Sequence, residues 1–408
     1  MSFTGANINK MNGGLGRSSD SDRVIVLVVG MTLAGTLAYY ESHEVLDMTG
    51  VEGLGITAST DDTNSELVHY HLSEMFRLSP ESKFHIIPVD KTMTPTALVA
   101  DAALKAAIRG IPDVNVIGFA GLTTTVAAAL TDAVLFQSLV TAFAMEHLLI
   151  DGIFVEGIGA VAPIEVTAYP DMRTISAPNV TYVIGQDPAV AALKVGYALR
   201  AAIGTVLGSV AVRNIHEDLG SVDIEIKPRS RKGEENYSLS SEVLGYWLSA
   251  ALSDGKKFST LTLAEQKSLT AKGFMYVGKF ADYGGYYLNG CPTSVVKSSD
   301  YAYFNNNCVW NKAARIIRRT LIPKVRSKVP TDPTTGYFKS TWVADAEGLV
   351  SKKLEPMIAA GNIEAADVYI NPAQTVSETV PMTIKAQVVM GQIVHEFDVD
   401  LGLTSKIV

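Results

Sequence analysis

The residues that could do chemistry in this chain are few and poorly placed for it. An apolar run from Arg23 ends at Gly30, and Gly35 follows five residues later. A phosphate-binding loop would continue with Lys and then Ser or Thr, but Thr36 and Leu37 come next. The glycine spacing of a dinucleotide site is missing as well. This stretch is therefore typical of an ordinary turn between a strand and a helix.

The patterns for metal binding and nucleophilic catalysis are also incomplete. His69 and His71 lie two residues apart near Glu66, and on a helix this spacing points the two imidazoles to different faces. Cys291 and Cys308 have no CxxC partner and no adjacent histidine, and two cysteines do not make a disulfide framework. We therefore expect no catalytic residue, no metal, no cofactor and a reducing compartment.

Composition and charge narrow the class of protein further. The 408 residues are 47% hydrophobic and 19% charged, which is enough for a large core and two domains. Lys and Arg number 34 against 42 Asp and Glu, a net charge of −8 that argues against general nucleic-acid binding. Acidic pairs such as Asp61-Asp62 are expected to be solvated loop residues. The polar N-terminal stretch lacks the apolar core of a secretory signal.

The densest charged feature is basic. Arg315, Arg318 and Arg319 share one face of a predicted helix, while Ile316 and Ile317 turn away from it. The cationic run continues with Lys324, Arg326 and Lys328. Such a face is either simply solvated or a docking ridge for an acidic protein. Nucleic acid is disfavoured because no aromatic platform is interleaved.

The elements that must position these residues alternate in type over the first half of the chain. Continuous apolar runs predict strands that are covered on both faces. These strands are expected over residues 23–30, 84–89, 114–120, 153–158 and 180–185. The helices are expected to begin at a Thr63-x-x-Glu66 capping box, at Thr94-Pro95, at Asp132 and at Asp187-Pro188. A buried helix running into a strand is expected over 189–212. The alternation predicts an α/β fold with a doubly wound, mainly parallel sheet.

A mixed α/β region follows after about residue 213. An exposed connection is predicted over 214–236. A capping box at Thr262-x-x-Glu265 predicts a helix ending at Gly273, with strands at 274–280 and 286–288. Long helices are predicted over 301–328, interrupted by Pro323, and over 337–360. Strands are predicted over 366–370 and 380–390.

Both terminal regions are unusual because neither can satisfy its own backbone hydrogen-bonding groups. Residues 1–23 carry few large apolar side chains, so they form either a disordered tail or an arm that orders against something else. Near the other end, apolar and acidic residues alternate with the period of a strand. The apolar face comprises His395, Phe397, Val399 and Leu401, and the acidic face comprises Glu396, Asp398 and Asp400. Such a strand must pair, and a neighbouring subunit is as available as its own sheet.

Two parts of the chain resemble the tail sheath proteins of phages and phage-derived contractile elements. The first is the opening Asn7-Ile-Asn-Lys-Met-Asn-Gly-Gly-Leu-Gly16. The second runs from Leu263 onward and includes Leu269-Thr-Ala-Lys-Gly-Phe-Met-Tyr, Gly285-Tyr-Tyr-Leu-Asn, Ser299-Asp-Tyr-Ala-Tyr, Asn311-Lys-Ala-Ala-Arg-Ile-Ile-Arg and Val368-Tyr-Ile-Asn-Pro-Ala-Gln. The middle of the chain is similar only in its general α/β character.

The resemblance implies a helical homopolymer built around an inner tail tube. It implies extended arms exchanged between subunits: an N-terminal arm with Ile8, Asn9, Met11 and Asn12, and the C-terminal strand with His395, Phe397, Val399 and Leu401. It makes Arg315, Arg318 and Arg319 candidates for contact with an acidic tube surface, with Lys352 and Lys353 on the next helix in competition. Contraction would then be mechanical and need no cofactor.

The same resemblance sets expectations for organisation and partners. It implies an arm at 1–23, an outer domain at 24–255 and an inner core domain at 256–408. Baseplate and tail terminator proteins are the other expected partners, without nucleic acid or membrane insertion. Assembly is expected in the host bacterial cytoplasm, as part of a phage tail or contractile particle. The rival hypotheses are a nucleotide- or substrate-binding α/β enzyme, which the doubly wound pattern alone motivates, and a different phage structural protein such as a tube or baseplate subunit.

Overall fold

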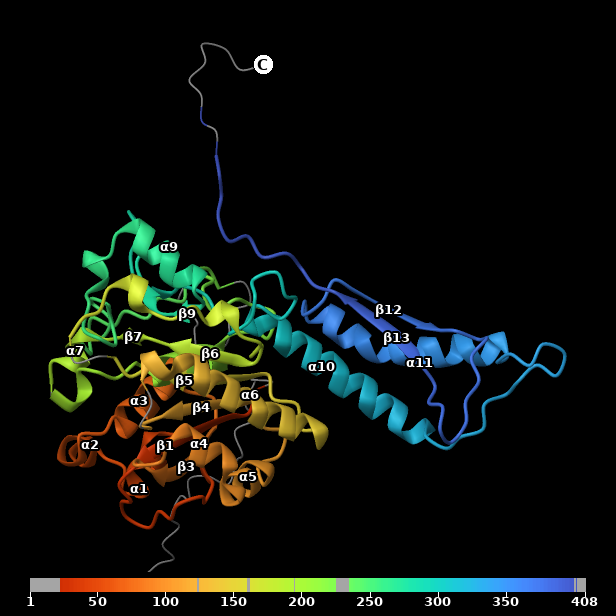
Figure 1. The fold of residues 1–408 in the computed structure, drawn as a ribbon, viewed down its shortest axis with the longest axis horizontal. Coiled ribbons are helices and arrows are strands. Elements are labelled where there is room, and N and C mark those ends of the chain that lie inside the picture. Colours follow the sequence, from red (N-terminus) through yellow and green to blue (C-terminus); the bar gives the residue numbers. More distant parts are fainter. Residues whose placement is uncertain are drawn as a thin grey trace, which may run out of the picture. The chain divides into compact units, whose positions relative to one another are not determined.

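The chain divides into two compact units. The computed structural model describes residues 23–122, 125–159, 162–193, 195–224, 235–399 and 401 (Figure 1). The first unit comprises Met1–Asn214 and Leu219–Ala302, and the second comprises Ile215–Asp218 and Tyr303–Val408. The division after Ala302 lies later than the expected boundary at residues 255 and 256. The reason is that β9 (Phe274–Met275) pairs with a strand of the first unit's sheet.

The first unit is built on a seven-stranded sheet in the order β2-β3-β1-β4-β5-β6-β9. Its remaining strands are β1 (Ile25–Met31), β2 (His43–Val45), β3 (Phe84–Asp90), β4 (Val116–Ala120), β5 (Gly152–Glu156) and β6 (Val180–Val183). All neighbouring pairs are parallel except β2 with β3. Every residue of β1 and β4 is buried, as the continuous apolar runs predict.

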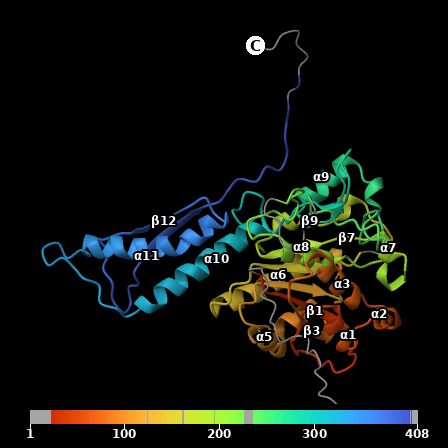
Figure 2. The same ribbon diagram turned by 180° about the vertical axis from the view of Figure 1, so that it is seen from behind.

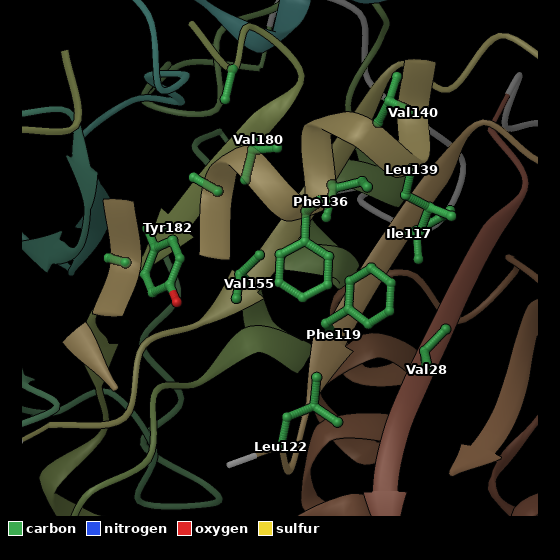
Figure 3. Close-up of a cluster of buried hydrophobic side chains, with 14 of the residues drawn as sticks. Val28, Ile117, Phe119, Leu122, Phe136, Leu139, Val140, Val155, Val180 and Tyr182 are labelled. Atoms are coloured by element: carbon green, nitrogen blue, oxygen red, sulfur yellow. The ribbon is translucent and has the colours of Figure 1, made fainter. Parts of the chain in front are cut away.

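Helices pack on both faces of this sheet, which confirms the doubly wound fold. On one face, Phe119 of β4 stacks on Phe136 of α6 (Ala129–Met145) with ring centroids 4.5 Å apart (Figure 3). On the other face, α8 (Ile203–Val212) lies so close to β4 that a Cβ on Gly118 would come within 2.5 Å of Leu207. The sheet is therefore covered by apolar helices on each side.

The other helices of this unit follow the strands in the alternating order. They are α1 (Met48–Gly53), α2 (Ala58–Asn64), α3 (Val68–Leu78), α4 (Pro95–Ala100), α5 (Ala102–Arg109), α7 (Pro188–Ala191) and α9 (Leu263–Ala271). Two small antiparallel pairs complete the unit: β7 (Gly185–Gln186) with β8 (Ala251–Leu252), and β10 (Val277–Gly278) with β11 (Tyr287–Leu288). The capping box at Thr262 and Glu265 is present at the start of α9.

Helix α6, together with the preceding turn, is long and apolar enough to span a membrane. The stretch Val126–Met145 has the length and the apolar composition of a membrane-spanning helix, and it is the one such helix among the described residues. Its side chains Phe136, Leu139 and Phe143 are at most 1% exposed within the sheet-covering core. Packing on the sheet thus accounts for the apolar residues on the buried face of the helix, whereas Val134 and Met145 are exposed.

The second unit combines two long helices with a two-stranded sheet (Figure 2). Its elements are α10 (Phe304–Leu321), α11 (Ser340–Ala359), β12 (Ala365–Ile370) and β13 (Ile384–Val389). Helix α11 packs against both α10 and β12. The predicted interruption at Pro323 is a 3-10 turn, Ile322–Lys324.

The predicted capping box at Thr63 and Glu66 is wrong. Helix α3 begins at Val68, and its N-terminal N–H groups are capped from a distance by Asp61. The Asp61 carboxylate accepts from Val68 N at 3.0 Å and from Tyr70 N at 3.1 Å. Asp61 is therefore a buried capping residue, 5% exposed, and not the solvated loop residue that was expected.

One further expectation fails nearby, and a second is met only in part. The segment 189–212 was expected to run from helix into strand, but its second half is α8, a helix in which every residue is buried. Gly204 and Gly208 explain the helix, because they let it approach the backbone of α3 more closely than any side chain would allow. The connection expected to be exposed over 214–236 begins with buried residues, namely Ile215, Glu217, Asp218 and Leu219, whereas Asp223 and Glu235 are exposed. Residues 225–234 of this connection lie outside the described residues.

Burial of Asp61 predicts an unusual pH dependence of stability. Desolvation raises the pKa of Asp61 from 3.8 to about 6 against the lowering effect of the α3 N–H groups. The folded state then holds this proton more tightly than the unfolded state, so stability present below pH ~4 is lost as the pH rises through ~6. We expect the unfolding free energy of the wild type to fall by about 2–3 kcal/mol relative to Asp61→Asn over this window.

Denaturant unfolding of both proteins at several pH values measures this difference. Thr63→Ala is the control, since Thr63 is exposed and should leave the pH dependence as in the wild type. A parallel pH dependence for Asp61→Asn and wild type would contradict the raised pKa.

Candidate inter-subunit and tube-contact surfaces

The segment after β13 carries the predicted C-terminal exchange strand. Residues 390–399 are extended and have no strand partner among the described residues (Figure 1). Phe397, Val399 and Leu401 are 82%, 76% and 91% exposed. The His395 ring stacks on Tyr303, with centroids 5.1 Å apart. Within this chain the predicted strand joins no described sheet, and its pairing with a neighbour stays a prediction.

The predicted N-terminal arm residues cannot be placed. Ile8, Asn9, Met11 and Asn12 lie outside the described residues.

The two-stranded sheet of the second unit has a definite pattern of outward-facing backbone groups. Ile370 is in register with Ile384, yet its N–H donates to Glu347 Oε1 at 2.7 Å. Hydrogen-bonded and non-hydrogen-bonded pairs alternate along an antiparallel ladder, so this pair is of the non-hydrogen-bonded kind. The residues that point N–H and C=O groups outward are Ala366, Val368 and Ile370 on β12, and Ile384, Ala386 and Val388 on β13.

The two outer edges differ in how far they are closed. On β12, Glu347 takes the N–H of Ile370, and the next outward carbonyl, that of Pro372, accepts from Phe338 N at 3.0 Å. On β13, the three outward residues make no hydrogen bond to another described residue outside the pair. A two-stranded sheet is marginal by itself in water. Here α11 packs on β12, and the edge of β13 stays available.

The basic candidates lie on a helix, as predicted. Arg315 is half-buried on α10, and Arg318 and Arg319 are exposed near its C-terminal end, where cations also complement the helix dipole. Ile316 and Ile317 are only half-buried, so this part of α10 has no deeply buried apolar face. Lys324, Arg326 and Lys328 beyond the helix are exposed, as are Lys352 and Lys353 on α11. The tube-contact role of either set is not tested by these positions.

The carboxyl ends of β1 and β4 are where a doubly wound sheet would bind a ligand, because the strand order reverses there. In this chain the place is occupied from within. Thr32 N donates to Glu66 Oε1 at 2.9 Å after β1, and Gly121 N donates to Glu156 Oε2 at 2.7 Å after β4. Backbone N–H groups of this kind hold phosphates in nucleotide-binding proteins. Here the chain's own carboxylates take that position.

A buried ion network closes the same place. Glu156 is 1% exposed, 3.1 Å from Arg200 Nη1 and 3.5 Å from His71 Nε2. Burial alone would raise the pKa of Glu156. The charge of Arg200, the imidazole of His71 and the backbone N–H of Gly121 together hold this pKa below its ordinary value. His71 Nδ1 accepts from Gly204 N, so the imidazole proton sits on Nε2 toward the carboxylate. Glu156 Oε2 accepts from both Gly121 N and Arg200 Nη1, so this oxygen is taken up within the protein.

The space left at this edge is too small for a substrate. The cavity lined by Gly30, Glu66, His71, Gly121 and Arg200 has a volume of about 10 Å³. That is room for about one water, whereas ligand sites occupy roughly 300–1,000 Å³. The binding crevice that would support the enzyme hypothesis is therefore filled.

The remaining chemistry-bearing residues do not converge. His71 belongs to the network above, while His69 Nε2 lies 3.5 Å from Glu52 Oε1. Cys291 and Cys308 are buried thiols that form no disulfide. Among the described residues no group of three or more His, Cys, Asp or Glu could hold a metal ion.

Sequence reasoning missed Glu347 and Tyr303. Glu347 looks like any polar residue on the outer face of a helix, and its bond to Ile370 depends on how α11 crosses the sheet. Tyr303 meets His395 across a separation of more than ninety residues. Neither contact leaves a periodic signal in the sequence.

Comparison with known proteins assigns the family. Residues 3–291 match the family described as DUF2586, N-terminal domain, and residues 300–407 match DUF2586, C-terminal domain. The chain belongs to the DUF2586 family. The family boundary between 291 and 300 agrees with the division of the fold after Ala302. No curated protein matches the sequence.

The DUF2586 chain shares its whole fold with sheath proteins of contractile particles. A chain of the anti-feeding prophage helical sheath in the contracted state matches with a TM-score of 0.61 and 14% identity, covering 100% of both chains. The sheath complex of an extracellular contractile injection system, PVC, matches with a TM-score of 0.56 and 12% identity over 100% of this chain and 98% of that one. A sheath tail protein from Desulfitobacterium hafniense matches with a TM-score of 0.50 and 10% identity, covering 95% and 100%. The predicted resemblance to sheath proteins is confirmed at the level of the fold.

The close approach of β1 and β4 gives a direct prediction for the filled crevice. A Cβ on Gly30 would lie 2.3 Å from the carbonyl oxygen of Gly121, a backbone atom that cannot move aside. We expect Gly30→Ala to lower the unfolding free energy by about 2 kcal/mol or more. Thermal or denaturant unfolding measures it.

The matched control is Gly53→Ala at the end of α1, where an added Cβ meets nothing within 4 Å. This variant should be neutral or more stable by up to ~1 kcal/mol, because Ala favours helix over Gly. Equal stability of the two variants would mean that the crevice is not closed by backbone contact.

Proposed function

We propose that this DUF2586 protein is the subunit of a contractile sheath. Subunits polymerise helically around an inner tube, and contraction of the polymer drives the tube through a target envelope. The proposal rests chiefly on full-length likeness to sheath chains, seen in both an anti-feeding prophage and a PVC particle. The available edge of β13 and the extended segment 390–399, which joins no described sheet, support it independently.

Polymerisation uses exchange of terminal segments. Strands that add to a neighbour's sheet satisfy main-chain groups on both partners, and head-to-tail contacts that do not close generate an open helix. The C-terminal strand with Phe397, Val399 and Leu401 adds to a sheet in the next subunit. The N-terminal arm, 1–23, makes a second exchange. The connected lattice then persists while the subunits move.

The tube contact is electrostatic. Arg315, Arg318 and Arg319 of α10 face an acidic tube surface, with Lys352 and Lys353 of α11 as the competing set. Exposed ion pairs contribute roughly 0–1 kcal/mol each and weaken in salt. Contacts of this strength can hold a tube in place and still release it during contraction.

The driving force is stored in the lattice. Subunits assemble in an extended, metastable state set by a baseplate and closed by a tail terminator, and they relax to better contacts when released. The step needs no cofactor, nucleic acid or membrane insertion of the subunit. In this arrangement residues 24–255 belong to the outer part and the C-terminal region to the part facing the tube. Assembly takes place in the host bacterial cytoplasm.

Electron microscopy of the purified protein at rising concentration, alone and with a tube protein, tests the proposal. We expect hollow, striated tubes of uniform width. Monomers or small closed rings under all conditions, together with a tight small-molecule ligand in a thermal-shift screen, would favour the enzyme alternative instead.

Deletion of the terminal segments gives a sharper prediction. Proteins lacking residues 1–20 or 393–408 should stay folded, because the core of each described unit lies outside these segments, but should remain monomeric. Circular dichroism checks the fold, and sedimentation velocity checks assembly. Normal polymerisation of both truncated proteins would refute strand exchange.

Charge reversal separates the two tube-contact candidates. Arg318→Glu with Arg319→Glu should abolish assembly on a tube while leaving tube-independent polymers intact. The matched variant, Lys352→Glu with Lys353→Glu, changes the same number of exposed charges on α11. If only this second variant loses tube binding, the contact lies on α11. Cosedimentation with tubes over a series of salt concentrations is the measurement.

A further inference from the structure

A ring contact fixes the segment after β13 to its own unit. The His395 imidazole stacks on the phenol ring of Tyr303, with centroids 5.1 Å apart and an angle of 24° between the ring planes. We propose that Tyr303 and His395 form a pivot that stays closed in the polymer, so that His395 belongs to the donating subunit and only the residues after it are free to leave. The role of this pivot rests on the proposed function, since it concerns how one copy of the chain reaches another.

Tyr303 is held firmly enough to be the fixed side of the pivot. It is the N-cap residue of α10, and its neighbours in the chain, Ala302 and Phe304, are each 1% exposed. The Tyr303 carbonyl accepts from Asn306 N at 3.2 Å, a hydrogen bond of the first helical turn. The ring is therefore carried by the start of α10.

His395 differs from the residues that follow it in the same alternating row. Phe397 and Val399 are 82% and 76% exposed, whereas His395 has a ring partner in its own chain. A contact that held the segment back from a partner would have to cover Phe397 and Val399. The stack leaves both of them uncovered, so it positions the segment and does not block it.

The pivot determines where the free part of the segment begins. The six residues from Met390 to His395 span at most about 20 Å when extended. Without the stack, Glu396 could start anywhere within that reach of the end of β13. With the stack, it starts beside the first turn of α10, which the chain passes after leaving the sheet (Figures 1 and 2). Restricting the start raises the effective concentration of the segment at its acceptor and lowers the ordering cost of assembly.

Assembly by variants of Tyr303 tests the pivot. Tyr303→Ala removes the ring, and Tyr303→Phe keeps it as the matched control. We expect Tyr303→Ala to raise the critical concentration for polymerisation by about two- to tenfold, the effect of losing one aromatic pair. His395→Ala should do the same, and the double variant should be no worse than either single one. Fully additive effects of the two single changes, or no effect of either, would overturn the pivot.

A covalent link distinguishes a closed pivot from a contact that opens on assembly. Tyr303→Cys with His395→Cys, joined in the monomer by a bifunctional maleimide with a short spacer, should still polymerise. In the matched control, Tyr303→Cys with Phe397→Cys, the same link draws the segment back by about 7 Å and should prevent polymerisation. The native Cys291 and Cys308 are buried. If the protein linked through position 395 fails to polymerise while its unlinked form succeeds, the pivot is refuted.

A measurement on the monomer separates failure of the pivot from failure of the proposed function. A nitroxide label on Phe397→Cys reports the mobility of the segment through its electron paramagnetic resonance line width. We expect narrower lines when Tyr303→Ala is added, and unchanged lines with Tyr303→Phe. Equal line widths in all three proteins would overturn the pivot whether or not polymers form. The expected narrowing, in a protein that never polymerises, would support the pivot and count against the proposed function alone.

Discussion

The structure of the second unit depends on one constraint: the backbone groups of a strand must find partners. The first unit meets this constraint within itself, because its seven-stranded sheet ends in β2 and β9, strands of three and two residues. Short edge strands present few open groups. The second unit differs, because its sheet has only two strands of six residues each, so that both strands are edge strands. The same chain thus contains one sheet with short edge strands and one with longer strands, of which β13 has no second neighbour among the described residues.

The first unit has the fold of a ligand-binding α/β protein, but its own side chains fill the place where a ligand would bind. Its switch point is held together by Glu66, Glu156, Arg200 and His71, so that side chains stabilise the loops that a bound anion would otherwise order. Removing one member of such a buried charged set leaves its partners unpaired and costs several kcal/mol. The network therefore joins the ends of the strands to α3 and α8 and stabilises their arrangement. Such a rigid scaffold is what a subunit of the proposed sheath would need.

The sequence predicted most of the strands and long helices because their signals are local. The apolar runs at 23–30 and 114–120, and the capping residues Thr94 and Thr262, each encode an element within a few neighbours. Distant interactions were missed. Asp61 caps α3 from seven residues away, and α8 is helical because two glycines fit against α3. The same distinction holds for the candidate surfaces. The basic face of α10 could be predicted from the spacing of its arginines. The hydrogen bond from Ile370 N to Glu347 depends on tertiary geometry and could not be predicted.

Two kinds of contact with different strengths follow from the charges of the second unit. Between residues 301 and 331 there are seven Lys and Arg and no acidic residue, whereas residues 391–401 carry three acidic residues and no Lys or Arg. Exposed cations bind a partner through pairs that salt screens and movement breaks. A strand ladder instead adds about 0.5–1.5 kcal/mol for each main-chain hydrogen bond, and such bonds act together along the strand. A lattice that contracts needs its subunits to stay joined while the tube is released. In the proposed sheath, separating strand exchange from the basic helix within one unit would give each contact the strength that its role requires.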